Sequence, residues 1–330
     1  MRKMLKTMKA HLNGGEDLVL VTVTASSGAT PRGAGARMLI NSQGRICGTI
    51  GGGAVEYRSE QIARKVLENK SSYGHDFTLT RDDVQNLGMI CGGACNVFFH
   101  FIPARDAAVI ALAEEAEQRF ARGDDLWLIS DIAAGGKLSL TDKSNTALAP
   151  HLTRHPHRLQ ENGLDLYIEQ INSCGRVYVF GGGHVAQELV PVLQHVGFRC
   201  VVMDDREEFT KPELFPTAET IIQGDFRRIS DYISLGSEDY VCVMTRGHAY
   251  DTVVQAQVLK CRPCYCGVIG SSHKAAGVRK VLKEEYGLAD EELNLVTTPI
   301  GLSIKGETPA EIAISIAAQL ILLRAERNGR

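Results

Sequence analysis

The most chemically suggestive feature of this sequence is a set of glycine-rich turns next to charged or thiol side chains. Four such turns occur, at Gly33–Gly35, Gly51–Gly53, Gly92–Gly93 and Gly181–Gly183. Because glycine has no side chain, a glycine-rich turn can expose several backbone N–H groups, and such a surface binds phosphate and other oxyanions. The sequence therefore predicts an anionic ligand at one or more of these turns.

Two arginines, Arg32 and Arg37, flank the first turn. A guanidinium group can bind a phosphate or oxo group through two parallel hydrogen bonds. We therefore expect Arg32, Gly33, Gly35 and Arg37 to bind an anion. The alternative is that the two glycines only shape a hairpin and that the arginines are solvated.

The second turn is followed by an acidic side chain and the third is preceded by a thiol. Gly52 and Gly53 would bind through their backbone, and Glu56 would either contact the ligand or be an ordinary first-turn carboxylate favoured by the helix dipole. Cys91 precedes the third turn, formed by Gly92 and Gly93. A thiolate beside backbone N–H groups has a lowered pKa, which suits metal ligation or sulfur transfer. The alternative for Cys91, and the expectation for Cys95, is a buried cysteine that acts as a small hydrophobe.

The fourth turn lies in a strand–turn–helix–strand pattern typical of dinucleotide-binding folds. An apolar strand at Val177–Phe180 runs into a G-x-G-x-x-A spacing, and a second strand at Cys200–Met203 ends in two acids. Gly181 would allow the tight turn and Gly183 the close approach of a pyrophosphate, while Asp204 or Asp205 would hold ribose hydroxyls. His184 opens the predicted helix, where its ring would either meet the ligand or lie at the surface.

Further polar residues follow two later apolar strands, Val241–Thr245 and Tyr265–Ile269. They are Arg246, His248, Asp251, Gly270 and Ser271. Because ligands of open α/β sheets bind outside the carboxyl ends of the strands, we expect these residues to share a crevice with the fourth turn. Asp251 is alternatively a helix cap. The cysteines Cys261, Cys264 and Cys266 are predicted to pack in the core, since no fourth zinc ligand lies nearby, and redox activity of Cys261 and Cys264 is the alternative.

The length of 330 residues predicts two domains, which we place at residues 1–172 and 173–330, with a polar connection from about residue 133. The regular alternation of strands and helices after residue 173 predicts an α/β fold. This is a Rossmann-like parallel sheet with helices on both faces, preceded by an N-terminal α/β domain. The first dozen residues predict a helix that docks through Met4, Leu5, Met8 and Leu12.

Composition narrows the class of protein. The net charge of −3 carries no electrostatic footprint for nucleic acid. We find neither an apolar run of membrane length nor a secretion signal, so no membrane partner is expected. The nine cysteines then indicate reduced thiols in a cytoplasmic protein.

Seven motifs, in consistent order along nearly the whole chain, resemble the xanthine dehydrogenase accessory proteins, the XdhC/CoxI family. They are ATPRGAGARM (29–38), GTIGGGAVE (48–56), CGGACNVFF (91–99), VFGGGHVAQEL (179–189), TRGHAYD (245–251), GVIGSSHK (267–274) and TPIGLSIKGETPAEIAISIAAQLI (298–321). The resemblance implies a homodimeric carrier, or chaperone, of molybdenum cofactor (a molybdopterin). Such a protein supports sulfuration of the cofactor together with a cysteine desulfurase, and delivers it to a xanthine dehydrogenase-type molybdenum hydroxylase.

The same resemblance marks Cys91 as the residue that contacts molybdenum. One departure concerns Ala54, where many members of the family carry cysteine or histidine. Because alanine cannot bind metal, the second turn should act through its backbone and Glu56. We expect the cofactor in a cleft between the two halves, against the turns of Gly33, Gly52 and Cys91.

The rival hypothesis is an NAD(P)-dependent oxidoreductase, with His248 as its proton donor, or a dinucleotide-sensing module without chemistry. The fourth turn and its two acids motivate it. Cys91 and the arginine-flanked turn have no role in that alternative but are expected in a cofactor carrier. The sequence therefore favours the carrier over an enzyme.

Overall fold

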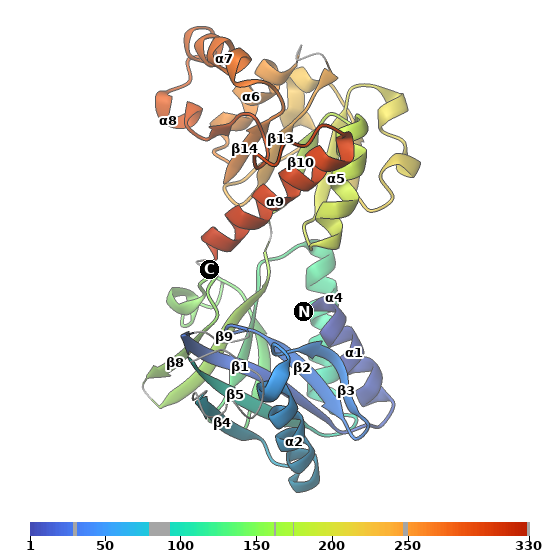
Figure 1. The fold of residues 1–330 in the computed structure, drawn as a ribbon, viewed down its shortest axis with the longest axis vertical. Coiled ribbons are helices and arrows are strands. Elements are labelled where there is room, and N and C mark those ends of the chain that lie inside the picture. The colour runs from blue at the N-terminus through green and yellow to red at the C-terminus, as the bar shows by residue number, and fades with distance from the viewer. Residues whose placement is uncertain (29–31, 79–92, 162, 174, 247–249, 329–330) are drawn as a thin grey trace. The chain divides into compact units, whose positions relative to one another are not determined.

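The computed structural model describes residues 1–330 except 29–31, 79–92, 162, 174, 247–249, 329–330 and the side chains of 272–274. The chain divides into two compact units, Met1–Ser173 and Cys174–Arg330, which are described separately (Figure 1).

The first unit contains an antiparallel five-stranded sheet in the order β3-β2-β1-β5-β4 (Figure 1). The strands are β1 (Leu18–Gly28), β2 (Arg37–Asn41), β3 (Gly44–Thr49), β4 (Tyr73–Thr78) and β5 (Gly93–Ile102). Helix α2 (Gly53–Asn69) packs on one face, against side chains such as Val19 and Val21. Helices α1 (Arg2–Asn13) and α4 (Ala107–Arg122) contribute to the core on the other face. The four predicted docking residues of α1, Met4, Leu5, Met8 and Leu12, are all buried.

A second antiparallel sheet completes the first unit, in the order β7-β6-β9-β8. Its strands are β6 (Leu126–Asp131), β7 (Lys137–Thr141), β8 (His157–Glu161) and β9 (Leu164–Asn172), with a 3₁₀ turn η1 (Ala149–His151). Most of the polar segment from residue 133 to 172 therefore builds hairpins of this sheet. The core under it contains the chain's one tryptophan, Trp127, whose indole donates to the carbonyl of Thr153 at 2.7 Å.

The second unit is built on a six-stranded sheet in the order β12-β11-β10-β13-β14-β15, and all its strand pairs are parallel. The strands are β10 (Val177–Phe180), β11 (Cys200–Asp204), β12 (Thr220–Gln223), β13 (Tyr240–Val243), β14 (Tyr265–Val268) and β15 (Val296–Thr297). The helices are α5 (His184–His195), α6 (Asp251–Lys260), α7 (Ser272–Glu284), α8 (Asp290–Leu293) and α9 (Pro309–Arg327). The 3₁₀ segments η2 (Glu207–Phe209), η3 (Pro212–Leu214) and η4 (Phe226–Asp231) lie in its connections. The predicted fold class is confirmed.

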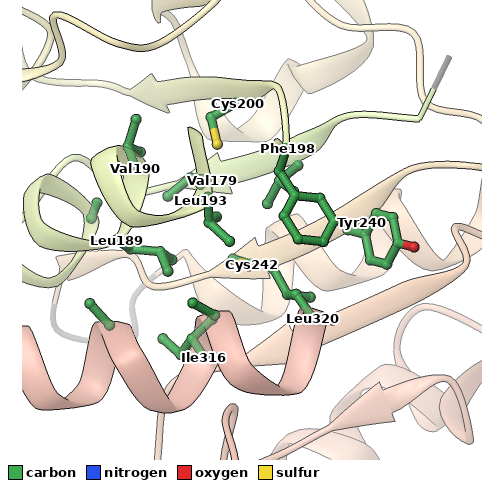
Figure 2. Packing of buried hydrophobic residues seen from close by; sticks show 14 of the residues in the cluster. Val179, Leu189, Val190, Leu193, Phe198, Cys200, Tyr240, Cys242, Ile316 and Leu320 are labelled. Carbon is green, nitrogen blue, oxygen red and sulfur yellow. The ribbon is translucent and has the colours of Figure 1, made fainter. Parts of the chain in front are cut away.

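Both faces of this sheet are covered, as its uninterrupted apolar strands require. Val177 and Val179 point into a core shared with α5 and α9, whereas Tyr178 and Phe180 point into a second core beneath α6, α7 and α8. Figure 2 shows Ile316 and Leu320 of α9 packed across from Leu193 of α5. In the part of the chain that the structure describes, no helix is long and apolar enough to cross a membrane.

Candidate functional site

The strand ends that flank the predicted ligand-binding turns of the first unit lie at one end of its five-stranded sheet. The strand register pairs Gly28 with Gly93 and Arg37 with Thr49. In antiparallel neighbours, the end of one strand lies beside the start of the next. The start of β2 at Arg37, the end of β3 at Thr49 and the start of β5 at Gly93 therefore lie at the same end of the sheet. Cys91 and Gly92 lie outside the described residues.

The glycines of the first turn shape a hairpin connection, which was the alternative to anion binding. The N–H of Gly35 donates to the carbonyl of Val23 at 2.9 Å, and Gly35 has a φ of +91°, which favours glycine. The N–H of Ala36 donates to the carbonyl of Gly33 at 3.2 Å. Gly33 and Arg32 are exposed. The two glycines thus shape the connection from β1 to β2, and Arg32 is the flanking arginine that faces solvent.

Arg37 does not have the accessible position that an anion-binding residue needs. Its side chain is only 3% exposed, forms an ion pair with Glu169 of the second sheet and donates to Thr22 at 3.2 Å. Its guanidinium also lies over the ring of Tyr167, 5.7 Å from the ring centre. The sequence could not distinguish it from Arg32, because this partner is distant in the chain. Arg37 links the two sheets of the unit.

The second turn already holds a carboxylate from its own chain. Glu56, which is 7% exposed, accepts hydrogen bonds from the Thr49 hydroxyl and from the N–H groups of Ile50 (3.0 Å) and Gly52 (3.1 Å). Burial alone would raise its pKa, but these hydrogen bonds and the ion pair with Arg45 outweigh burial and lower the pKa. The expectation that Gly52 presents a vacant N–H is therefore wrong, whereas Gly53, at the start of α2, is exposed.

The fourth turn has the geometry that its glycine spacing predicted. A Cβ atom on Gly181 would lie 2.3 Å from the carbonyl oxygen of Met244, and its φ of +112° also requires glycine. A Cβ atom on Gly183 would have no heavy atom within 4 Å, so this side of the turn is open. Gly183 begins α5 without a side-chain cap, and His184 is exposed. An anion could approach the first N–H groups of α5 from this side.

Asp204 and Asp205 have different environments. Asp204 is 1% exposed, and its Oδ2 accepts the N–H of Gly182 at 2.7 Å. Arg206 donates to both of its oxygens, at 2.9 and 3.0 Å, and stacks on Phe209 with 3.8 Å to the ring centre. Asp204 therefore braces the glycine turn and is not placed to hold a ribose. The carboxylate of Asp205, whose side chain is 33% exposed, is the accessible one.

These two carboxyl groups also differ in acidity. Burial would raise the pKa of Asp204, but the hydrogen bonds from Arg206 and Gly182 lower it. Burial and the neighbouring Asp204 raise the pKa of Asp205. The sequence D-D-R contained the necessary residues, but it did not show which acid would bind the arginine.

A third carboxylate closes the loop after β13. Asp251 is buried, and its Oδ1 accepts the N–H and the hydroxyl of Thr245 at 3.1 and 2.6 Å. Asp251 is the first residue of α6. Its carboxylate binds back to Thr245 and does not cap the helix, as the alternative predicted it would. Arg246 is exposed, and His248 lies outside the described residues.

Asp251, Gly270 and Ser271 come together at a cavity of about 230 Å³ beyond the end of β14. The sequence analysis missed Gln255 of α6, which lines this cavity and is 2% exposed. A glutamine within an apolar helix pattern carried no signal for this position. Among the described residues of the second unit, three of the predicted site residues therefore lie together at this cavity.

The remaining thiols give no metal centre among the described residues, where no three His, Cys, Asp or Glu side chains are grouped to hold one. Cys95 and Cys266 are buried as predicted, and burial raises the pKa of Cys266 to about 12. Cys264 packs partly buried against the core. The prediction of core packing is wrong for Cys261, which is exposed.

Comparison with known proteins gives consistent matches for both units. Residues 11–77 match the model described as the XdhC and CoxI family, and residues 177–320 match the XdhC Rossmann domain. A relative in Bacillus subtilis (strain 168), described as a probable xanthine dehydrogenase subunit, is 25% identical, over 96% of this chain and 96% of its own length. The molybdenum cofactor insertion chaperone PaoD of Escherichia coli (strain K12) is 23% identical, over 99% of this chain and 90% of its own. A crystal structure described as a xanthine dehydrogenase from Bacillus halodurans has the same fold, with a TM-score of 0.78 at 23% identity, over 99% of this chain and 96% of that one.

Proposed function

We propose, from the premise that this chain belongs to the XdhC and CoxI family, that it binds molybdenum cofactor and inserts it into a xanthine dehydrogenase-type enzyme. The observation that carries this proposal is the alignment with a molybdenum cofactor insertion chaperone over 99% of the chain. The protein would act as a carrier and not as a catalyst. The cofactor is its cargo.

The residues that would hold the cargo are those that the fold leaves accessible. In the first unit they are Arg32, Gly33 and Gly53, and Gly93 marks the strand that follows Cys91. In the second unit, Gly183 and His184 lie at the open start of α5. Backbone N–H groups and an arginine suit the phosphate and oxo groups of such a cofactor. Cys91 would supply a thiolate to molybdenum or to sulfur transfer.

Support from a cysteine desulfurase and assembly as a homodimer are further parts of the proposal. They come from the family resemblance. We infer that the desulfurase acts on the cofactor while the homodimer holds it, so that the cofactor acquires its terminal sulfur on this protein before it is delivered.

The second candidate function is dinucleotide binding, which the strand order and the glycine turn of the second unit favour. The engagement of Asp204 with Gly182 and Arg206 argues against a ribose held by that acid. Asp205 would have to replace it. Because the buried acid at the end of β11 is already bonded within the chain, the carrier function is favoured over dinucleotide binding.

The test is retention of released cofactor by the purified protein. The two are mixed without oxygen and separated by gel filtration, and the protein peak is assayed for molybdenum and for oxidised pterin fluorescence. We expect stoichiometric co-elution, followed by activation of an apo xanthine dehydrogenase-type enzyme. Cys91→Ser should retain less cofactor or transfer it without sulfur, whereas Cys261→Ser, at an exposed thiol, serves as the control.

NAD and NADP binding is measured by calorimetry on the same samples. Firm dinucleotide binding without retention of pterin would replace the proposal with the second candidate. Unchanged retention and unchanged activation by Cys91→Ser would remove Cys91 from the mechanism.

A further inference from the structure

The cavity beyond the carboxyl end of β14 has mostly apolar walls. Its volume is about 230 Å³, and strand, helix and loop residues contribute to it. The apolar lining comprises Val268, Ile269, Val278, Leu282, Leu293 and Val296. An apolar cavity of about 150 Å³ can hold a benzene ring. The volume here therefore suits a ring system slightly larger than benzene.

One polar side chain of the wall, Gln255, has an acceptor that no described residue contacts through a hydrogen bond. The Nε2 of Gln255 donates to the carbonyl of Asp251 at 3.0 Å. Since a carbonyl only accepts hydrogen bonds, this contact fixes the orientation of the amide and leaves Oε1 as the acceptor on its other side. Oε1 has no hydrogen-bond partner among the described residues, although Gln255 is only 2% exposed. Oε1 itself keeps some accessible surface, so water satisfies it until the donor of a ligand takes the place of that water.

The surroundings of Gln255 favour an uncharged ligand. Asp251, also in the wall, already accepts two hydrogen bonds from Thr245. Arg279 reaches Asp290 and Asn294 at 3.3 and 3.0 Å, with its side chain 43% exposed, so its charge lies at the solvent side. Among the described lining residues, the charged side chains are already paired, so a charged ligand would lose its hydration without gaining a counter-ion from them. Ser271 is exposed, and this side gives access from solvent.

We propose that this cavity binds a flat, uncharged heterocycle that donates an N–H hydrogen bond to Gln255. Two sources present this chemistry, namely the amino-pyrimidinone edge of a pterin and the carboxamide of a nicotinamide ring. The site goes beyond cofactor carriage, because it does not depend on molybdenum or on Cys91. If the ring is a pterin, it locates part of the cargo in the second unit.

The experiment is calorimetric titration of the purified protein with free pterin, nicotinamide and methyl nicotinate. Methyl nicotinate retains the ring of nicotinamide but has no N–H donor. We expect pterin or nicotinamide to bind, and the N–H donor to matter about tenfold, which is the size of one hydrogen bond of about 1.4 kcal/mol. In Gln255→Leu, binding of the donor ring should weaken about tenfold, and nicotinamide and methyl nicotinate should become equivalent.

A second variant tests the cavity without removing a hydrogen bond. Ala275 lines the cavity, so Ala275→Leu should fill it and abolish binding while the midpoint of thermal unfolding is kept. Ala310→Leu, the same change at an exposed position of α9, should bind as the wild type does. Failure of both rings to bind at millimolar concentration, or binding that survives Ala275→Leu, would overturn the proposal.

The result also separates this site from the proposed function. Binding of nicotinamide that depends on Gln255, in a protein that retains no molybdenum cofactor, keeps this site and removes the carrier function. Retention of cofactor with no binding of either ring has the opposite meaning. Weakened cofactor retention by Gln255→Leu would assign the cavity to the pterin.

Discussion

Carboxylates from this chain bind to two of the glycine turns that the sequence suggested for external anions, and a third carboxylate binds in the same way after β13. Glu56 binds the N–H of Gly52, Asp204 binds the N–H of Gly182, and Asp251 binds the N–H of Thr245. Each is at least nine-tenths buried. A glycine-rich turn therefore needs no ligand to satisfy its donors when an acid follows at a suitable distance. Under the proposed function, the open start of α5 and the accessible residues at the end of the first sheet are the places that remain for ligand binding.

We predict that Asp204 stabilises the fold and that Asp205 does not. Asp204→Asn should lower the free energy of unfolding by about 1–3 kcal/mol at neutral pH, because charged hydrogen bonds to Gly182 and Arg206 are weakened. Asp205→Asn should be neutral or slightly stabilising, since it removes a carboxylate whose pKa is raised by burial and by Asp204. Urea unfolding of both variants measures the difference.

The contribution of Asp204 to the free energy of unfolding should depend on pH. The folded-state pKa of Asp204 lies below its ordinary value of 3.8, so its contribution is complete above that value. The contribution is lost as the pH falls through the folded-state pKa. The gap between the wild type and Asp204→Asn should therefore close in acid, whereas a gap that is constant from neutral to acidic pH would contradict the assignment.

Residue types at this scale could be predicted from the sequence, but their partners could not. The glycines and acids at the ends of the strands were identifiable from their spacing. The choice between Asp204 and Asp205, or between Arg32 and Arg37, depends on tertiary contacts. Arg37 meets Glu169, more than a hundred residues away, and Gln255 borders a cavity that no local pattern describes.

Long elements with strong periodicity were predictable at the scale of helices and strands. Helix α1 buries its four predicted docking residues, and α9 begins with a Thr308–Glu311 capping box, with Pro309 at its first position. The missed strands are β4, whose exposed polar residues lack an apolar run, and β12 and β15, which are four and two residues long. Short edge strands form because a neighbour offers hydrogen bonds, and their own sequence contributes little.

Two substitutions in the glycine turn before α5 test separately the role of this turn in the fold and its role in ligand binding. Gly181→Ala should destabilise the second unit by at least about 3 kcal/mol, because a Cβ would lie 2.3 Å from the Met244 carbonyl at a φ of +112°. Gly183→Ala should change the free energy of unfolding by less than about 1 kcal/mol, since its φ is −69° and the space around it is open. If a ligand phosphate lies on this turn, Gly183→Ala should still lose cofactor retention. Thermal unfolding and gel filtration measure the two effects, and full retention by Gly183→Ala would show that the turn only shapes the fold.

At the scale of the whole molecule, the two units have separate hydrophobic cores. The core clusters of the first unit draw on its two sheets with α1, α2 and α4. Those of the second unit draw on the six-stranded sheet with its helices. A domain of about 150 residues or more buries enough surface to be stable alone. We therefore predict that the units unfold in separate steps.

The single tryptophan makes this prediction measurable. Trp127 is buried in the first unit, so its fluorescence reports the unfolding of that unit alone, whereas far-ultraviolet circular dichroism reports the unfolding of both units.

Arg37→Met leaves Glu169 without its buried partner and should cost about 3–5 kcal/mol, which shifts the fluorescence midpoint in urea to a lower concentration. Asp251→Asn should leave that midpoint unchanged and shift only the remaining dichroism transition, because it weakens the bonds to Thr245 in the second unit. The control Arg37→Met/Glu169→Leu should regain much of the first loss, since no buried charge remains. If both single variants move fluorescence and dichroism together, the two cores act as one cooperative unit, and a ligand bound to either unit would then stabilise the whole chain.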